Sequence, residues 1–146
     1  MIKELRYRIF CTIILGFFVL STQAQLSVIV NNSVKEPDLS MKTLTQIYKG
    51  SIVRWNDNTR IILCMMRPET ELGKLTCKKV IGKSVFETNK MYLSLVFQGV
   101  ISPPKFFITE KDLKNFVNQN AGAIGILSKD STASAIIIKI EGYDNF

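Results

Sequence analysis

Histidine is absent from the 146-residue sequence. Its absence removes at once the commonest general base of enzymes and the commonest side-chain ligand of transition metals. The sequence also has no Walker phosphate loop, no nucleophile elbow and no cluster of metal-ligating residues. Its carboxylates Asp57 and Glu69 have no evident catalytic partner. We therefore expect a protein that is not an enzyme and that carries no cofactor or metal.

Long apolar runs are also missing, apart from one near the N-terminus. Residues 1–24 combine a basic start, the apolar run Ile9–Leu20 and small residues up to Ala24, which is the pattern of a secretory signal peptide. The run is about a dozen residues long, too short for a comfortable membrane span. We predict cleavage near Ala24, a periplasmic or otherwise exported domain over residues 25–146, and no stable transmembrane protein after processing. A retained N-terminal anchor is the alternative.

Clustered positive charge is lacking as well. The predicted mature chain has 16 basic and 11 acidic residues, and the basic ones are scattered, with Lys78-Lys79 the densest pair. Nucleic-acid binding requires a basic stripe with interleaved aromatic residues, so we expect no nucleic-acid partner. A mild attraction for small anions fits this charge better.

Cysteine is scarce, and only Cys64 and Cys77 remain after the predicted cleavage. In an oxidising compartment the two could form a disulfide that closes a 14-residue loop, worth about 3 kcal/mol. The alternative is a pair of buried thiols that act as small hydrophobic side chains.

Hydrophobic periodicity predicts an α/β domain with a mixed sheet and helices on its faces. Strands are expected at Leu26–Val30, Arg60–Met66, Ala123–Leu127 and Ala135–Ile140, with a short strand or packing segment at Phe106–Ile108. A first helix is expected between an N-cap at Asp38 or Ser40 and a C′ glycine at Gly50. Further helices are expected from about Glu71 or Gly73 to near Gly82, over roughly Val85–Phe97, and over Glu110–Asn118. In the helix Val85–Phe97 we assign Phe86, Met91, Leu93 and Phe97 to the core.

The stretch Leu39–Ile62 organises the rest of the chain. It contains a helix with an apolar face, a glycine at position 50 suited to ending that helix, and the only tryptophan, Trp55. We expect Trp55 to pin its loop against the core; stacking on a ligand is the alternative.

Several features of this stretch and of its surroundings resemble one known family. They are Leu39-Ser40, Ile47-Tyr48-Lys49-Gly50, Arg54-Trp55-Asn56-Asp57, the strand ending at Arg67, and Gly122 to Leu127. In this order and spacing they resemble the periplasmic substrate-binding proteins of phosphate ABC transporters, in particular the short stand-alone exported proteins with that domain. The resemblance covers Val28 to about Leu127. It implies a type 2 periplasmic-binding-protein fold, in which two α/β lobes close on a ligand, with about one lobe and part of a second present here.

The loop after the central strand both matches the family and departs from it. The family's phosphate loop resembles Arg-x-x-Gly-Ser-Gly-Thr, and Arg67 matches its arginine. The residues that follow lack the Ser-Gly-Thr set and place Glu69 and Glu71 where an anion would be held.

Ligands of open α/β sheets bind beyond the carboxyl ends of strands, which selects the loops 31–33, 67–76 and 128–132. Oxyanion recognition needs a guanidinium, neutral donors and backbone N–H groups. The candidate ligand-binding residues are Arg67, Thr70, Gly73, Lys74, Thr76, Asn31, Asn32 and Ser33. In the alternative, Arg67 pairs with Glu69 or Glu71 on a solvated loop, and residues 31–33 only form a turn.

The expected function is that of an exported solute-binding-type protein, which binds a small oxyanion such as phosphate without catalysis. The alternative is an accessory or interaction module of an envelope or transport system that has lost the anion site. Because the resemblance implies a missing lobe, an envelope protein or a second copy of the chain would then cover the open face.

Overall fold

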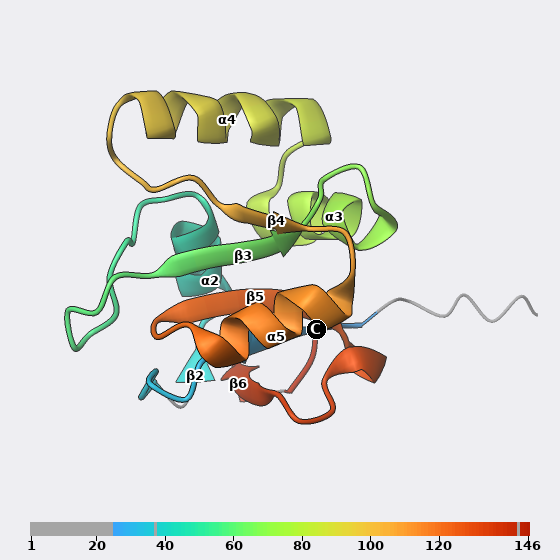
Figure 1. Cartoon of the computed structure of the whole chain (residues 1–146). Helices are drawn as coiled ribbons and strands as arrows, with labels where there is room; N and C mark the ends of the chain where they lie inside the picture. The colour runs from blue at the N-terminus through green and yellow to red at the C-terminus, as the bar shows by residue number, and fades with distance from the viewer. Residues whose placement is uncertain (1–24, 37, 143) are drawn as a thin grey trace, which may run out of the picture.

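The computed structural model describes residues 25–36, 38–142 and 144–146 (Figure 1). The predicted signal peptide, residues 1–24, lies outside these ranges. Within them, no helix is both long and apolar enough to span a membrane.

A six-stranded mixed sheet forms the centre of the domain, in the spatial order β2-β6-β1-β5-β3-β4. The strands are β1 (Leu26–Val30), β2 (Asp38–Leu39), β3 (Ile62–Met66), β4 (Lys105–Phe107), β5 (Ala123–Ser128) and β6 (Ile136–Ile140). Strand β1 is antiparallel to both of its neighbours, whereas the β2–β6, β5–β3 and β3–β4 pairs are parallel. Five strands therefore end at one edge of the sheet, which we call the carboxyl edge. Strand β1 ends at the opposite edge, the amino edge.

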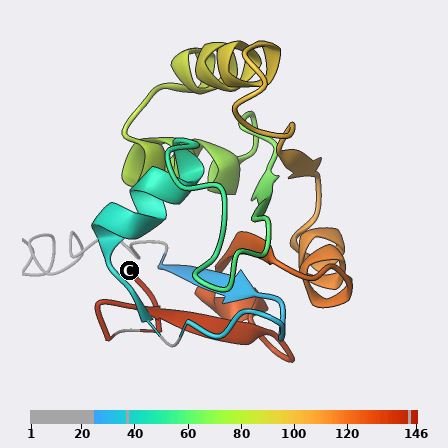
Figure 2. The same cartoon turned by 90° about the vertical axis from the view of Figure 1, so that its left-hand side faces the viewer.

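Helices cover both faces of the sheet, as predicted (Figures 1 and 2). They are α2 (Met41–Tyr48), α3 (Glu71–Thr76), which continues directly into the π-helical η1 (Cys77–Ile81), α4 (Val85–Phe97), α5 (Glu110–Gln119) and the 3-10 turn η2 (Lys129–Ser131). Residues along β3 alternate between the two faces. Leu63 and Met65 join the core cluster of α2 and η1, and Cys64 and Met66 join that of α5. The central strand is buried on both sides, as its continuous apolar run predicts.

The stretch Leu39–Ile62 has the structural role expected of it. Ser40 caps α2 by accepting a hydrogen bond from the N–H of Thr43, and Gly50, at φ +75°, follows the helix end. The Tyr48 hydroxyl donates to the carbonyl of Cys64 at 3.1 Å. The indole N–H of Trp55 donates to the carbonyl of Gly122 at 2.9 Å. Trp55 is buried, so it fixes the loop to the core.

Helix α4 has the predicted bounds, but three of its four predicted core residues are wrong. Phe86, Leu93 and Phe97 are 77%, 59% and 83% exposed, whereas Met91 is half-buried and packs against the core cluster, as predicted. The face toward the body of the domain instead carries Thr88 and Tyr92. The helix is apolar on more than one side, so the pattern of apolar residues does not indicate which side packs inward.

Candidate functional site

The three candidate loops do not converge on one site. Loop 67–76 follows β3 and loop 128–132 follows β5, so both lie at the carboxyl edge. Residues 31–33 follow β1, which runs the opposite way, and therefore lie at the amino edge. The three loops therefore do not surround one position, because β1 runs opposite to β3 and β5.

Asn31 and Ser33 have structural partners at the amino edge. The side-chain amide of the buried Asn31 donates to the carbonyls of Val117 and Asn118, at 2.8 and 2.9 Å, where α5 ends. The Ser33 hydroxyl accepts from the N–H of Gly122 at 2.9 Å. Asn32 is exposed. These contacts favour the turn-forming alternative for Asn31 and Ser33.

At the carboxyl edge, Thr70 and Gly73 shape the start of α3. The Thr70 hydroxyl caps the helix, since it accepts from the N–H of Gly73 at 3.1 Å and donates to the carbonyl of Arg67 at 2.8 Å. A Cβ atom at position 73 would overlap that same carbonyl oxygen and would come within 2.9 Å of the Cα of Pro68. Because Gly73 has no Cβ, the backbone of Arg67 and Pro68 can lie directly against the first turn of α3.

Lys74 and Thr76 also have partners within their own helix. The Lys74 ammonium contacts the Glu71 carboxylate at 2.9 Å, and this hydrogen bond lowers the pKa of Glu71. The Thr76 hydroxyl donates to the carbonyl of Leu72 at 2.9 Å and is buried. In this conformation, neither side chain is positioned as a free donor for an anion.

At the carboxyl edge, Arg67 is the predicted residue whose side chain the structure leaves available. It is exposed at the end of β3, and the Lys74–Glu71 contact is the only ion pair within the described part of the chain. The pairing of Arg67 with Glu69 or Glu71 is therefore not observed. Arg67 lines a depression of about 210 Å³ together with Pro68, Glu69, Asn89 and Phe106.

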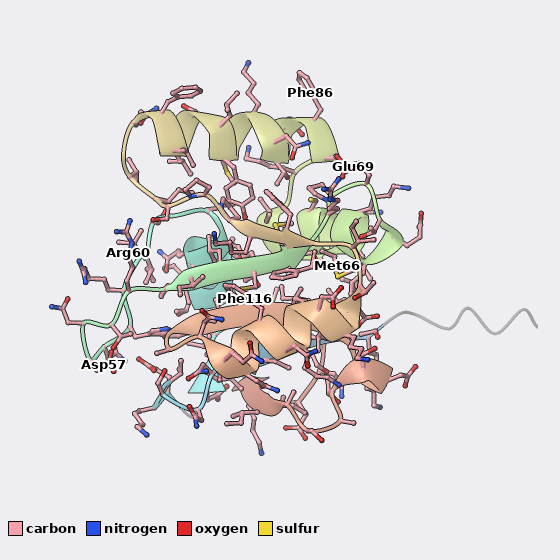
Figure 3. The ribbon with its side chains drawn as sticks, viewed as in Figure 1. Asp57, Arg60, Met66, Glu69, Phe86 and Phe116 are labelled. Atoms are coloured by element: carbon pink, nitrogen blue, oxygen red, sulfur yellow. The ribbon has the colours of Figure 1, made fainter. Side chains whose placement is uncertain are left out.

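Asn89, which comes from α4, is a candidate contact that the sequence did not indicate. It is more than twenty positions from Arg67 in the chain, and only the placement of α4 above β4 brings the two residues to one depression. In Figure 3, Glu69 lies beside the beginning of α4, on the same side of the molecule as Met66 at the end of β3. The depression thus offers a guanidinium and an amide to an anion, with one carboxylate beside them.

The third loop, 128–132, is held by a carboxylate. Glu110 accepts hydrogen bonds from the backbone N–H of Ser128 at 2.7 Å and from its hydroxyl at 2.9 and 3.0 Å. A negative side chain at this position disfavours an anion at this loop.

Cys64 and Cys77 are free, buried thiols. Cys64 belongs to the core cluster of α5 and Cys77 to that of α2, so they lie on opposite sides of the sheet. The structure supports the alternative of two buried thiols and not the disulfide. Burial raises the pKa of Cys64 to about 12 and also raises the pKa of Cys77.

This burial predicts that stability decreases in alkaline solution. The folded state holds the Cys64 thiol neutral up to a pKa of about 12, from an ordinary value of 9.0, so the unfolded chain loses its proton first. The contribution is fully present below pH 9.0 and is lost as the pH rises toward about 12. In urea unfolding at successive pH values, the free energy of unfolding should decrease more steeply with pH for the wild type than for Cys64→Ala. Equal slopes would contradict the assignment. Burial raises the pKa of Tyr48 in both proteins, and the Cys64 thiolate raises it further in the wild type only, so both effects of the cysteine steepen the wild-type slope.

No protein-family model matches the sequence, and no curated protein matches it significantly. Solved structures do match. A phosphate transport receptor from Vibrio cholerae superposes with a TM-score of 0.62 at 22% identity, over 83% of this chain and 48% of the receptor. PstS from Borrelia burgdorferi gives a TM-score of 0.65 at 13% identity, over 82% and 48% of the two chains. The chain has part of the fold of a phosphate-type substrate-binding protein.

A third structure, a putative phosphate ABC transporter substrate-binding protein from Clostridium perfringens, contains bound phosphate. It superposes with a TM-score of 0.60 at 19% identity, over 82% of this chain and 46% of that one. The chain therefore spans about half the length of the binding proteins it matches. At these identities the likeness establishes the fold, and the predicted resemblance to this family is confirmed at that level.

Proposed function

We propose that this chain is an exported, non-catalytic solute-binding-type protein whose ligand is a small oxyanion such as phosphate. The observation that carries the proposal is the fold shared with phosphate-binding proteins, together with an exposed Arg67 at the carboxyl edge that has no ion-pair partner among the described residues. The Arg67 guanidinium can bind two oxygens of one anion. The Asn89 amide, which lines the same depression, would add a neutral donor.

The depression predicts weak binding. It is exposed, it has a volume of only about 210 Å³, and Glu69 repels a second negative charge at short range. Exposed charges are also screened by salt. We therefore expect millimolar affinity that decreases with ionic strength.

Removal of Arg67 should abolish stabilisation by phosphate. At a phosphate concentration ten times the dissociation constant, wild-type protein should gain about 1.4 kcal/mol in unfolding free energy, measured by thermal unfolding at low salt. Arg67→Ala should gain nothing. Arg54→Ala is the matched control: Arg54 is also exposed but donates to the carbonyl of Asn58 in the Trp55 loop, and its variant should keep the gain. Absence of both heat and stabilisation in wild-type protein at millimolar phosphate or sulfate would overturn the proposal.

A second candidate function is supported by the outer surface of α4. Phe86, Leu93 and Phe97 form an exposed apolar stripe at helical spacing, and Figure 3 shows Phe86 directed away from the body of the domain. Such a surface typically marks an interaction site. We propose that, if the chain is an accessory module, a second copy covers this stripe. In an antiparallel pair of α4 helices, Phe86 of one copy would lie opposite Phe97 of the other, as a two-fold interface requires.

The oligomeric state tests this second candidate. Light scattering after size exclusion should report a dimer at micromolar concentration, and Phe97→Ser should shift it to monomer. Ile136→Ser is the control, because Ile136 is an exposed apolar residue (47%) on β6, away from the stripe. A wild-type chain that stays monomeric at high micromolar concentration would rule out self-association through α4.

A further inference from the structure

The amino edge of the sheet contains a larger cavity, of about 470 Å³. It lies between the end of α2, the start of β3 and the connection from α4 to β4. Its walls are mainly aliphatic and include Ile47, Ile52, Ile61, Leu63 and Ile101. We call it the Gly50 cavity, after the glycine that also lines it.

The Gly50 cavity is distinct from the depression at Arg67. Ile62 and Leu63 are at the beginning of β3, and Lys105 is at the beginning of β4. Arg67, in contrast, follows the end of β3. In Figure 3, Arg60 lies at the end of the molecule opposite Met66 and Glu69. A ligand in the cavity would therefore not contact the proposed oxyanion site.

Among the described residues, two cations line the cavity and no carboxylate does. The cations are Arg60 and Lys105, both exposed, and Ser102 adds a hydroxyl. Neither cation forms an ion pair within the described part of the chain. The nearest acid in sequence to Arg60 is Asp57, whose carboxylate accepts a hydrogen bond from the N–H of Thr59 at 2.8 Å. The cavity thus combines an aliphatic interior with an uncompensated positive rim.

Local geometry shapes one wall of this cavity. Gly50, at φ +75°, follows the end of α2, and a Cβ there would come within 2.8 Å of Cγ2 of Ile101. Ile101 is buried at this wall. Pro103 and Pro104, which come after Ser102, stiffen the connection to β4. Apolar cavities of about 300–1,000 Å³ with a few polar groups are typical of sites for small organic ligands.

We infer that the Gly50 cavity binds a free amphipathic acid, a molecule with an apolar body and one carboxylate. The apolar body would occupy the aliphatic interior and displace water from it. The carboxylate would lie at the rim between Arg60 and Lys105, where it would form charge-assisted hydrogen bonds. The chain then carries a second ligand site, with a chemistry different from that of the oxyanion site.

Three probes with the same apolar chain and different head groups test this inference: decanoate, decanol and decyltrimethylammonium, each below its critical micelle concentration. In amide NMR spectra, decanoate should shift the signals of Gly50, Ile52, Leu63 and Ile101 saturably. Decanol should bind about tenfold more weakly, as the loss of the charged contact implies, and the cation should not bind. Equal binding of all three probes, or shifts confined to the outer stripe of α4, would overturn the inference.

Substitutions at the rim and in the interior give an independent test. Arg60→Gln combined with Lys105→Gln should weaken decanoate binding about tenfold and leave decanol binding unchanged. Lys111→Gln, at an exposed lysine of α5, is the control and should change neither. Val53→Phe, at a half-buried lining position, should block both probes, whereas Ile136→Phe on β6 should not. Unchanged decanoate affinity in the double variant would contradict the inference. Phosphate should shift none of the four cavity signals, so this test is separate from that of the oxyanion proposal.

Discussion

Gly73→Ala is expected to destabilise the domain by on the order of 3 kcal/mol or more. A methyl group at this position would overlap the backbone oxygen of Arg67 and approach the Cα of Pro68. Backbone atoms cannot rotate away as a flexible side chain can, so α3 or the loop before it must shift. Such a shift would also disturb the Thr70 cap, whose loss costs about 1 kcal/mol. Urea unfolding followed by circular dichroism measures the difference.

Gly82→Ala is the matched control for this prediction. Gly82 is left-handed, at φ +72°, but a Cβ there meets nothing within 4 Å. Gly82→Ala should lower the free energy of unfolding only by the strain of the left-handed backbone, about 1 kcal/mol. If Gly73→Ala lowers the free energy of unfolding by no more than Gly82→Ala does, the backbone of Arg67 and Pro68 does not lie as close to Gly73 as described. Gly73 would then regain its predicted role as a backbone donor to a ligand.

Tyr92→Ala is expected to destabilise the domain by about 3–5 kcal/mol, as the loss of a buried aromatic side chain usually does. Tyr92 is 4% exposed, and its hydroxyl donates to the carbonyl of Tyr48 at 2.8 Å. Its ring also lies edge-on to Phe106, with 6.4 Å between the ring centroids. The variant would therefore leave a cavity between α4 and the domain and an unpaired carbonyl at the end of α2.

Phe97→Ala, on the same helix, is expected to change stability by less than about 0.5 kcal/mol, because a mostly exposed side chain loses few contacts. Phe97 is 83% exposed. Comparison of the two variants in urea, at a protein concentration where the chain is monomeric, tests which face of α4 packs inward. A larger decrease in the free energy of unfolding for Phe97→Ala than for Tyr92→Ala would show that the face with Phe97, and not the face with Tyr92, packs inward.

Local sequence signals predict most of the elements. The continuous apolar run before Arg67 gives a strand buried on both faces, and the bounds of α4 agree with the prediction. Ser84 and Glu87 form a capping box at its start, which explains why that boundary is sharp. Strand β2 was missed because it has only two residues, too few for a periodic pattern.

Tertiary arrangement was harder to predict. The direction of β1 decides that Asn31 lies far from Arg67, and pairing direction is not encoded in a strand's own composition. The inward face of α4 was misassigned because its apolar residues occur on more than one side. The sequence indicates Arg67 as a candidate contact but not Asn89, because it does not show which side of α4 faces the sheet. Their proximity depends on how α4 is placed over β4.

The proposed anion site lies at the carboxyl edge and depends on Arg67. A titration of the full domain with phosphate at low salt, followed by amide NMR, tests this location. We expect saturable shifts at Arg67, Glu69, Thr70 and Asn89, with none at residues 31–33, and loss of the shifts in Arg67→Ala. Shifts confined to the amino edge, or no shifts at millimolar phosphate, would contradict it.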